Sequence, residues 1–244
     1  RAVEVDPREL AELLGHLIFA SQCVSGGRTY MQNMLNQFSG FEVDWRRARV
    51  RPSKSGGAWR QVLLTDGFWR DVEWWLRMLP SRHFISAASS ERRTAEAAIT
   101  GTDSSDWGTG QLAWIDGARS ETALEFTSVE RRRPINWREL LGILRVVQAF
   151  GDQLRGRTVL IETDNMAAKG AASKFASSSE DMQELVRRLL EYAERFELTL
   201  RFVHTPGELL HRPDQTSRGD AVEEPRARLV RKEIRAVLAG HGPF

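Results

Sequence analysis

Four acidic residues in this 244-residue sequence stand where carboxylates could act together on a metal ion. Asp103 and Asp164 each end a short apolar run that predicts a strand, so both side chains can stand at the rim of a sheet. Glu139 lies on the apolar stripe of a predicted helix, where an unpaired carboxylate is costly. Asp214 follows Pro213 and lies where a terminal helix could begin. Oxygen-only ligands of this kind suit Mg²⁺ or Mn²⁺.

Each of these carboxylates also has a purely structural interpretation. Asp103 could begin a turn, and Asp164 could cap the helix that follows it. Glu139 lies three residues after Asn136, the position of a capping-box glutamate. Asp214 could favour the dipole of a terminal helix. Taken singly, these structural interpretations are the simpler ones, whereas the four residues taken together favour a shared metal site.

The elements that must position these residues form an α/β pattern. Hydrophobic periodicity predicts strands over 96–103, 107–116 and 121–129, a helix over 136–154, a strand over 157–164, a short helix over 165–174, a helix ending near 196 and a last strand over 197–204. This order predicts a mixed sheet whose first three strands form an antiparallel meander, with parallel strands added beside it and helices flanking it.

A small, mainly helical region precedes the sheet. Helices are expected over 7–22, 28–38 and 65–80, with a loop over 39–60 and a short strand near 59–64. A polar stretch over 81–95 indicates a linker. We therefore expect three parts: 1–90, 91–218 and a C-terminal helical tail over 219–244. Cys23, the single cysteine, is expected to be buried in a helix.

Composition narrows the class of protein. The chain is 41% hydrophobic and 28% charged, which is ordinary for a soluble globular protein. No apolar run is long enough to span a membrane, and the first residues lack the pattern of a signal peptide, so we expect an intracellular protein, nuclear or cytoplasmic and not secreted. The absence of an initiating methionine indicates a piece of a longer chain. Basic clusters at 45–54 and 130–134 lie beside aromatic residues, although such runs are more often solvated faces than nucleic-acid contacts.

The local motifs resemble those of reverse-transcriptase-linked ribonuclease H domains. "TDSSDWGTG" is similar to their TDAS-x-x-GWG, "INWREL" to IN-x-x-EL and "ETDN" to TDN, while "HTPGELLHRPDQTSR" is similar to H-x-PG-x-x-N-x-x-AD-x-x-SR. The four carboxylates follow one another at intervals of 36, 25 and 50 residues, which suits that fold. The sequence departs from the family pattern at Asp106, Leu210 and Pro213. The resemblance implies a ribonuclease H-like mixed five-stranded sheet.

The N-terminal part resembles the polymerase thumb of DIRS-like, tyrosine-recombinase retrotransposons. The motifs are "LLGHLIFASQCVSGGR" and the Trp-rich "FWRDVEWW", and the whole resemblance covers roughly 8–218. The Tyr-x-Asp-Asp motif of the polymerase palm is absent, since the two tyrosines, Tyr30 and Tyr192, are followed by other residues. The resemblance therefore implies that the palm and fingers region of a parent polyprotein is a partner and that this chain does not polymerise DNA by itself.

The resemblance also implies an activity: a metal-dependent endoribonuclease hydrolysing the RNA strand of RNA–DNA hybrids with two Mg²⁺ ions, for which Mn²⁺ can substitute. Asp103 would be shared by both ions, Asp164 would hold the ion on the nucleophile side, and Glu139 and Asp214 would complete the site. His204 and His211 are possible auxiliary residues. Nucleic-acid contacts are expected from Arg131, Arg132, Arg133, Asn136, Asn165, Lys169 and Lys174.

Two other classes remain open at the level of sequence. The chain could be a domesticated, catalytically silent fragment that serves as an RNA-binding or structural subunit of a larger assembly, and the motif departures leave room for this. Retention of all four carboxylates argues against it, because a scaffold does not need them. An integrase- or transposase-like nuclease would share the fold, but those enzymes usually carry three acidic residues, and a polymerase thumb would be out of place beside them.

Overall fold

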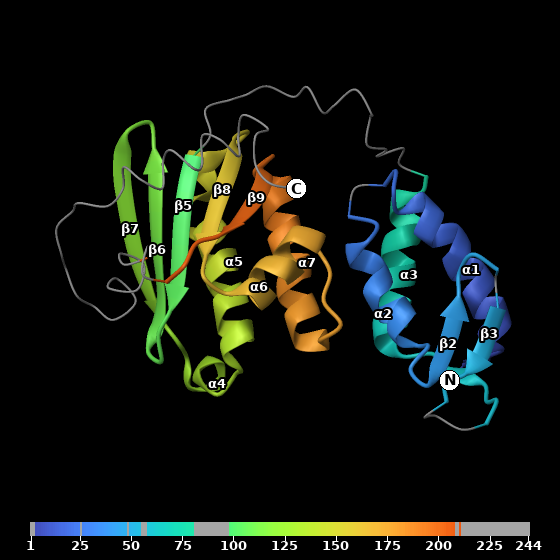
Figure 1. The fold of residues 1–244 in the computed structure, drawn as a ribbon. Coiled ribbons are helices and arrows are strands. Elements are labelled where there is room, and N and C mark those ends of the chain that lie inside the picture. The colour runs from blue at the N-terminus through green and yellow to red at the C-terminus, as the bar shows by residue number, and fades with distance from the viewer. Residues whose placement is uncertain are drawn as a thin grey trace. The chain divides into compact units, whose positions relative to one another are not determined.

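The computed structural model describes residues 3–24, 26–47, 49–54, 58–80, 98–207 and 210, and its elements are drawn in Figure 1. The chain divides into two compact units. Unit 1 comprises Arg1–Arg93 with Ala171–Glu191, and unit 2 comprises Thr94–Gly170 with Tyr192–Phe244. The expected boundaries at 90 and 218 stay predictions, and the expected tail over 219–244 lies outside the described residues.

Unit 2 is built on a five-stranded mixed sheet in the order β7-β6-β5-β8-β9 (Figure 1). The strands are β5 (Ala98–Ser104), β6 (Gly108–Ile115), β7 (Ala118–Glu125), β8 (Thr158–Thr163) and β9 (Thr199–His204). The β5–β6 and β6–β7 pairs are antiparallel, whereas β5–β8 and β8–β9 are parallel. The predicted three-strand meander with parallel strands added to it is therefore confirmed.

The turn between β6 and β7 is shorter than the sequence pattern predicts. It consists of Asp116 and Gly117, whose φ values of 52° and 81° are those of a two-residue hairpin turn. Strand β7 consequently begins at Ala118, so the expected strand over 121–129 was wrong at both ends. After β7 the chain forms the short helix α4 (Ser128–Arg131), which the pattern missed although Thr127 and Glu130 make a reciprocal capping box.

Helix α5 (Ile135–Leu154) packs on β5, β6 and β8 and contributes much of the core of unit 2. Its buried side chains recur at helical spacing and include Leu140, Ile143 and Leu144, none of which is exposed. Glycine at 142 allows a close approach to β5, because a Cβ there would lie 2.6 Å from Thr102 Oγ1. The helix and the strand are thus held together near the first turns of α5.

Two helices connect β8 to β9: α6 (Met166–Lys174) and α7 (Glu180–Arg195). Asn165 caps α6, since its Oδ1 accepts a hydrogen bond from the Ala168 amide at 2.9 Å. Helix α7 is strongly amphipathic, and its last residues belong to unit 2 while its first three turns belong to unit 1. Both helices were predicted with bounds correct to within a residue or two.

The N-terminal part of unit 1 is mainly helical, as predicted. It contains α1 (Pro7–Ala20), the 3₁₀ turn η1 (Thr29–Met31), α2 (Gln32–Asn36) and α3 (Asp66–Met78), with the paired strands β1 (Glu4–Val5) and β4 (Val62–Leu63). The strands β2 (Phe41–Asp44) and β3 (Arg49–Pro52) form a hairpin where a loop was expected. Among the described residues, no helix is both long and apolar enough to cross a membrane.

Two side chains of unit 1 differ from what their sequence context suggests. Cys23 is exposed and not buried, because α1 ends at Ala20 and the cysteine lies in the turn that follows. Asp71, on the middle of α3, is completely buried and bonded to the Arg187 guanidinium of α7 at 2.7 Å. Burial raises the pKa of Asp71, whereas Arg187 and the Asn33 amide oppose that shift by stabilising the carboxylate.

Candidate functional site

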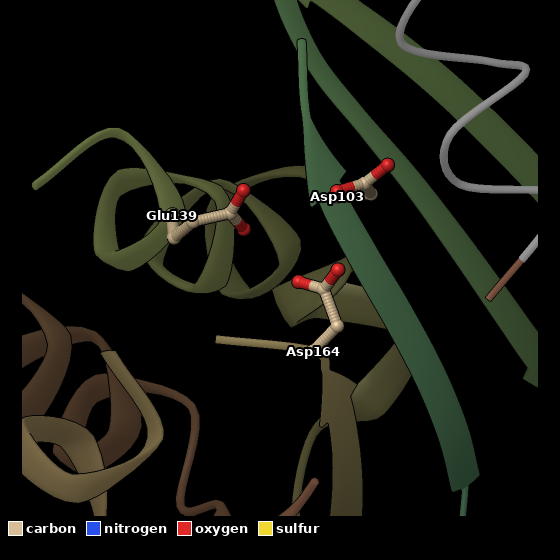
Figure 2. A group of neighbouring side chains, drawn as sticks. All are labelled: Asp103, Glu139 and Asp164. Carbon is tan, nitrogen blue, oxygen red and sulfur yellow. The ribbon is translucent and has the colours of Figure 1, made fainter. Parts of the chain in front are cut away.

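Three of the four predicted carboxylates meet at one edge of the sheet (Figure 2). One ligand atom from each of Asp103, Glu139 and Asp164 lies within 4.8 Å of the others. Asp103 is the penultimate residue of β5, and Asp164 immediately follows β8. Since β5 and β8 are parallel neighbours, their carboxyl ends reach the same edge, and the early turns of α5 bring Glu139 to it.

Close packing between α5 and β5 sets the distance across this site. Gly142, one turn after Glu139, faces Thr102 and Ser104, where no larger residue fits without displacing them. Ser104 Oγ donates a hydrogen bond to the Arg138 carbonyl oxygen at 3.2 Å. The Ser104 amide donates to Asp103 Oδ1 at 2.8 Å, which orients that carboxylate. These contacts orient the Asp103 carboxylate directly and fix the backbone of α5 next to Glu139.

Glu139 is the most unusual member of the group electrostatically. Its residue surface is 3% exposed, and its Oε2 atom is buried without a hydrogen-bond partner among the described residues. Burial raises the pKa of Glu139 to about 9, with further contributions from the nearby charges of Asp103 and Asp164. A buried glutamate without a partner for one oxygen needs either a proton or a cation.

The carboxylate group fits a divalent cation. Asp103 and Asp164 are half-buried and reach the surface, whereas Glu139 closes the buried side. All three residues offer hard oxygen ligands, as Mg²⁺ and Mn²⁺ require, and the unpartnered Oε2 of Glu139 is the kind of atom that a cation would satisfy. The alternative structural role for Glu139 is wrong, since α5 begins at Ile135 without a side-chain cap.

The end of β9 and the residues that follow it lie close to Asp164. His204 Nε2 lies 3.0 Å from the Asp164 carbonyl oxygen, and the Thr205 amide donates to the Thr163 carbonyl oxygen at 3.0 Å. A Cβ at Gly207 would lie 2.9 Å from Asp164 Oδ2, so the backbone of this segment passes close to the carboxylate. His204 therefore contacts the main chain of Asp164, which is a supporting position. His211 and Asp214 lie outside the described residues.

A second buried glutamate lies two residues before Asp164. Glu162 is 9% exposed, and its Oε1 accepts a hydrogen bond from Thr205 Oγ1 at 3.4 Å. Burial raises the pKa of Glu162 to about 7, and the Thr205 hydrogen bond opposes the shift. The contact joins β8 to the segment that passes Asp164.

The predicted nucleic-acid contacts fall into three groups. Asn165 Nδ2 donates to Asn136 Oδ1 at 3.0 Å, so these two residues join the start of α6 to the start of α5. The three consecutive arginines lie in and just after α4, where the guanidinium of Arg131 stacks over Trp107 and that of Arg133 over Trp137. Arg132 and Lys174 are exposed, and Lys169 is half-buried. Lys174 belongs to unit 1, unlike the other predicted contacts.

Sequence reasoning missed Arg138, the residue before Glu139. Its Nη1 atom donates at 3.1 Å to both the Ser105 carbonyl oxygen and Asp106 Oδ1, and thereby ties the turn after β5 to α5. Asp106, a departure from the family pattern, is thus bonded to an arginine and is not an additional member of the carboxylate group.

Comparison with known proteins yields structural neighbours alone. No family model matches the sequence, and no curated protein matches it. Among solved structures, RNase H1 from Halobacterium salinarum is 15% identical with a TM-score of 0.39, covering 51% of this chain and 98% of its own. The N-terminal RNase H domain of Rv2228c from Mycobacterium tuberculosis is 15% identical with a TM-score of 0.41, covering 51% of this chain and 98% of its own. A foamy viral protease-reverse transcriptase in complex with double-stranded DNA is 14% identical with a TM-score of 0.34, covering 82% of this chain and 38% of its own.

The class of fold follows from the sheet itself. A meander of three antiparallel strands, continued by two parallel strands in the order β7-β6-β5-β8-β9 and flanked by helices, is a ribonuclease H-like arrangement. The acidic cluster lies at the carboxyl ends of the central strands β5 and β8. The predicted fold class is therefore confirmed, while the activity is a separate matter.

Proposed function

We propose that this chain is a metal-dependent endoribonuclease that hydrolyses the RNA strand of RNA–DNA hybrids. The observation that carries the proposal is the convergence of Asp103, Glu139 and Asp164 within 4.8 Å, with Glu139 buried and one of its oxygens without a partner in the part of the chain that the structure describes. A structural role would not require three acidic side chains to face one another, because their mutual repulsion opposes folding. A metal-dependent phosphodiester hydrolase uses such a group to hold its cations.

The motif resemblance supports the same activity. The segments "TDSSDWGTG", "INWREL" and "ETDN" lie 36 and 25 residues apart at their acidic positions, yet those positions are neighbours in space. Asp214 supplies the fourth carboxylate in this proposal. We assign Asp103 to both metal ions, Asp164 to the ion on the nucleophile side, and Glu139 and Asp214 to the completion of the site, with Glu139 also near a ribose 2′-hydroxyl.

Two Mg²⁺ ions, or Mn²⁺ in their place, would supply Lewis acidity for activating water and stabilising the leaving oxygen. The protein's own part is positioning. Asp103 is oriented by the Ser104 amide, and the main chain of Asp164 is held by His204. Glu139 is fixed on a helix packed against β5. His204 and His211 remain possible auxiliary residues in this proposal.

We further propose that the chain is part of a retroelement reverse transcriptase of the DIRS-like type. Unit 1 would supply a thumb or connection region, and the palm and fingers region of the parent polyprotein would be the partner. The mainly helical N-terminal part, with the Trp-rich α3, supports this assignment. An intracellular location, nuclear or cytoplasmic, follows from this role.

The proposal is tested with the purified 244-residue chain. In Mg²⁺ it should cut RNA in a hybrid and spare single-stranded RNA and duplex DNA. Asp164→Asn should abolish cutting, whereas Asp152→Asn, which changes an exposed surface aspartate, should not. Hybrid binding without cleavage in either Mg²⁺ or Mn²⁺ would refute the enzyme and favour the catalytically silent, RNA-binding subunit.

A further inference from the structure

Trp107 is an exposed aromatic residue beside the carboxylate site. It lies in the turn between β5 and β6 and is 64% exposed. Its backbone is fixed, because its carbonyl oxygen accepts a hydrogen bond from the Phe126 amide at 2.8 Å and its amide donates to Ser105 Oγ at 3.1 Å. An indole on a rigid turn with this exposure offers a flat apolar surface to a ligand.

The same turn is connected directly to the carboxylate site. Asp103 lies on β5 just before it, and Arg138 bonds both Ser105 and Asp106 within it. Because Arg138 precedes Glu139 in α5, movement of the turn would also move the start of that helix. Figure 1 shows α4 at the same end of the sheet as the β5–β6 turn. Trp107 is thus held in a defined position relative to Asp103 and Glu139.

The surroundings of Trp107 favour a polyanion. The Arg131 guanidinium lies 4.8 Å from the centre of the indole ring, and Arg132 and Arg133 follow it in sequence. Glu125 is 4.0 Å from Arg131, but its side chain is 89% exposed, so this ion pair holds the arginine weakly. A guanidinium stacked on an aromatic ring keeps its N–H groups available for phosphate oxygens.

We propose that Trp107 stacks against an unpaired base in a single-stranded segment that adjoins the hybrid at the carboxylate site, while Arg131 and Arg132 contact the phosphates of that segment. In a continuous duplex the base faces are covered by their neighbours, so an exposed indole face is complementary to a base outside the stack. The inference deepens the proposed function, on which it rests, by naming a substrate class: hybrids with a single-stranded extension or gap.

The test compares blunt hybrids with hybrids that carry a short single-stranded extension on either strand at either end. Binding is measured on the full chain with Asp164→Asn, so that the RNA stays intact, and 2-aminopurine in the extension reports stacking. We expect the chain that keeps Trp107 to bind one of the extended hybrids more tightly than the blunt hybrid and to quench the 2-aminopurine in its extension. Trp107→Ala should weaken that binding by about tenfold and abolish quenching, while binding of the blunt hybrid stays unchanged.

Two controls separate stacking from a structural effect. Trp107→Phe should restore most of the preference, and Trp69→Ala, which removes another exposed tryptophan, on α3, should leave it intact. The inference would be overturned if Trp107→Ala lost affinity equally for blunt and extended hybrids, or lost affinity for neither. If the chain does not cut hybrids but Trp107→Ala still removes the preference for an extension, the proposed activity fails and the stacking role stands.

Discussion

Binding of a divalent cation to the carboxylate site should displace a proton from Glu139. Burial and two neighbouring carboxylates raise the pKa of Glu139 to about 9. A metal ligand must be ionised, so a cation that binds Glu139 takes the place of that proton. The perturbation is the addition of Mg²⁺ or Mn²⁺ to the metal-free chain, or its removal by a chelator.

The magnitude follows from the pKa. At pH 7 a group with a pKa of about 9 is ionised in only about one molecule in a hundred, so metal binding should release about one proton per chain. Ionising Glu139 at that pH costs about 3 kcal/mol, which reduces the apparent metal affinity by about a hundredfold. The affinity should therefore increase about tenfold for each unit of pH between the ordinary value of 4.5 and 9.

The stability of the metal-free chain should show the corresponding trend. Because the folded pKa of Glu139 lies above its ordinary value, the folded state binds more protons than the unfolded state between pH 4.5 and 9. The free energy of unfolding should fall as pH rises through this window. The destabilisation caused by Glu139 should be absent below pH 4.5 and complete above pH 9. Saturating Mn²⁺ should remove most of this fall.

Calorimetric titration of Mn²⁺ in buffers with different ionisation enthalpies measures the proton release directly. Glu139→Gln should bind the cation more weakly and release no proton at pH 7. Glu162→Gln is the matched control, because Glu162 is also buried and has a raised pKa but is not in the carboxylate cluster. Release that persists in Glu139→Gln and disappears in Glu162→Gln would refute the assignment of the proton to Glu139.

Two further predictions concern packing and charge, apart from the cleavage and stacking experiments above. Arg187→Ala leaves Asp71 buried without its cation and should lower the free energy of unfolding by about 3–5 kcal/mol in a denaturant titration, whereas Arg51→Ala removes an exposed ion pair and should cost less than about 1 kcal/mol. Gly142→Ala should push α5 away from Thr102 and weaken Mn²⁺ binding in the same calorimetric assay, whereas Gly170→Ala, where a Cβ has free space, should leave Mn²⁺ binding unchanged. Equal effects of the two members of either pair would contradict the reasoning.

Local sequence patterns were sufficient to predict much of the site. The apolar runs ending at Asp103 and Asp164 predicted two strand ends, and the stripe containing Glu139 predicted that its carboxylate would face inward. These are properties of single elements with strong periodicity. Convergence of the three residues also requires that β5 and β8 be parallel neighbours. The order of strands and helices indicated a mixed sheet but did not say which strands pair.

Features that depend on contacts between distant segments could not be predicted in this way. The Asp71–Arg187 pair joins residues 116 positions apart, and nothing in the sequence near either residue identifies the other. The bond between Asp106 and Arg138 spans 32 positions, so Asp106 looked like an additional acidic residue near the metal site. The β2–β3 hairpin was missed because each of its strands has only four residues and the flanking segments are rich in glycine and serine, a composition typical of loops.

The arrangement of burial across the carboxylates explains how the fold can hold a site that opposes its own stability. Asp103 lies near the end of β5, where it is paired with Gly110 of β6, and Asp164 immediately follows the neighbouring strand β8. Glu139 lies on a helix that Gly142 allows to pack closely on β5. The cost of the site is concentrated in one group, the buried Glu139, whose ionisation is opposed by burial and by two neighbouring charges. A cation bound to the three carboxylates would offset the cost of these charges, so the residue that weakens the metal-free fold should make the stability of the fold depend on metal.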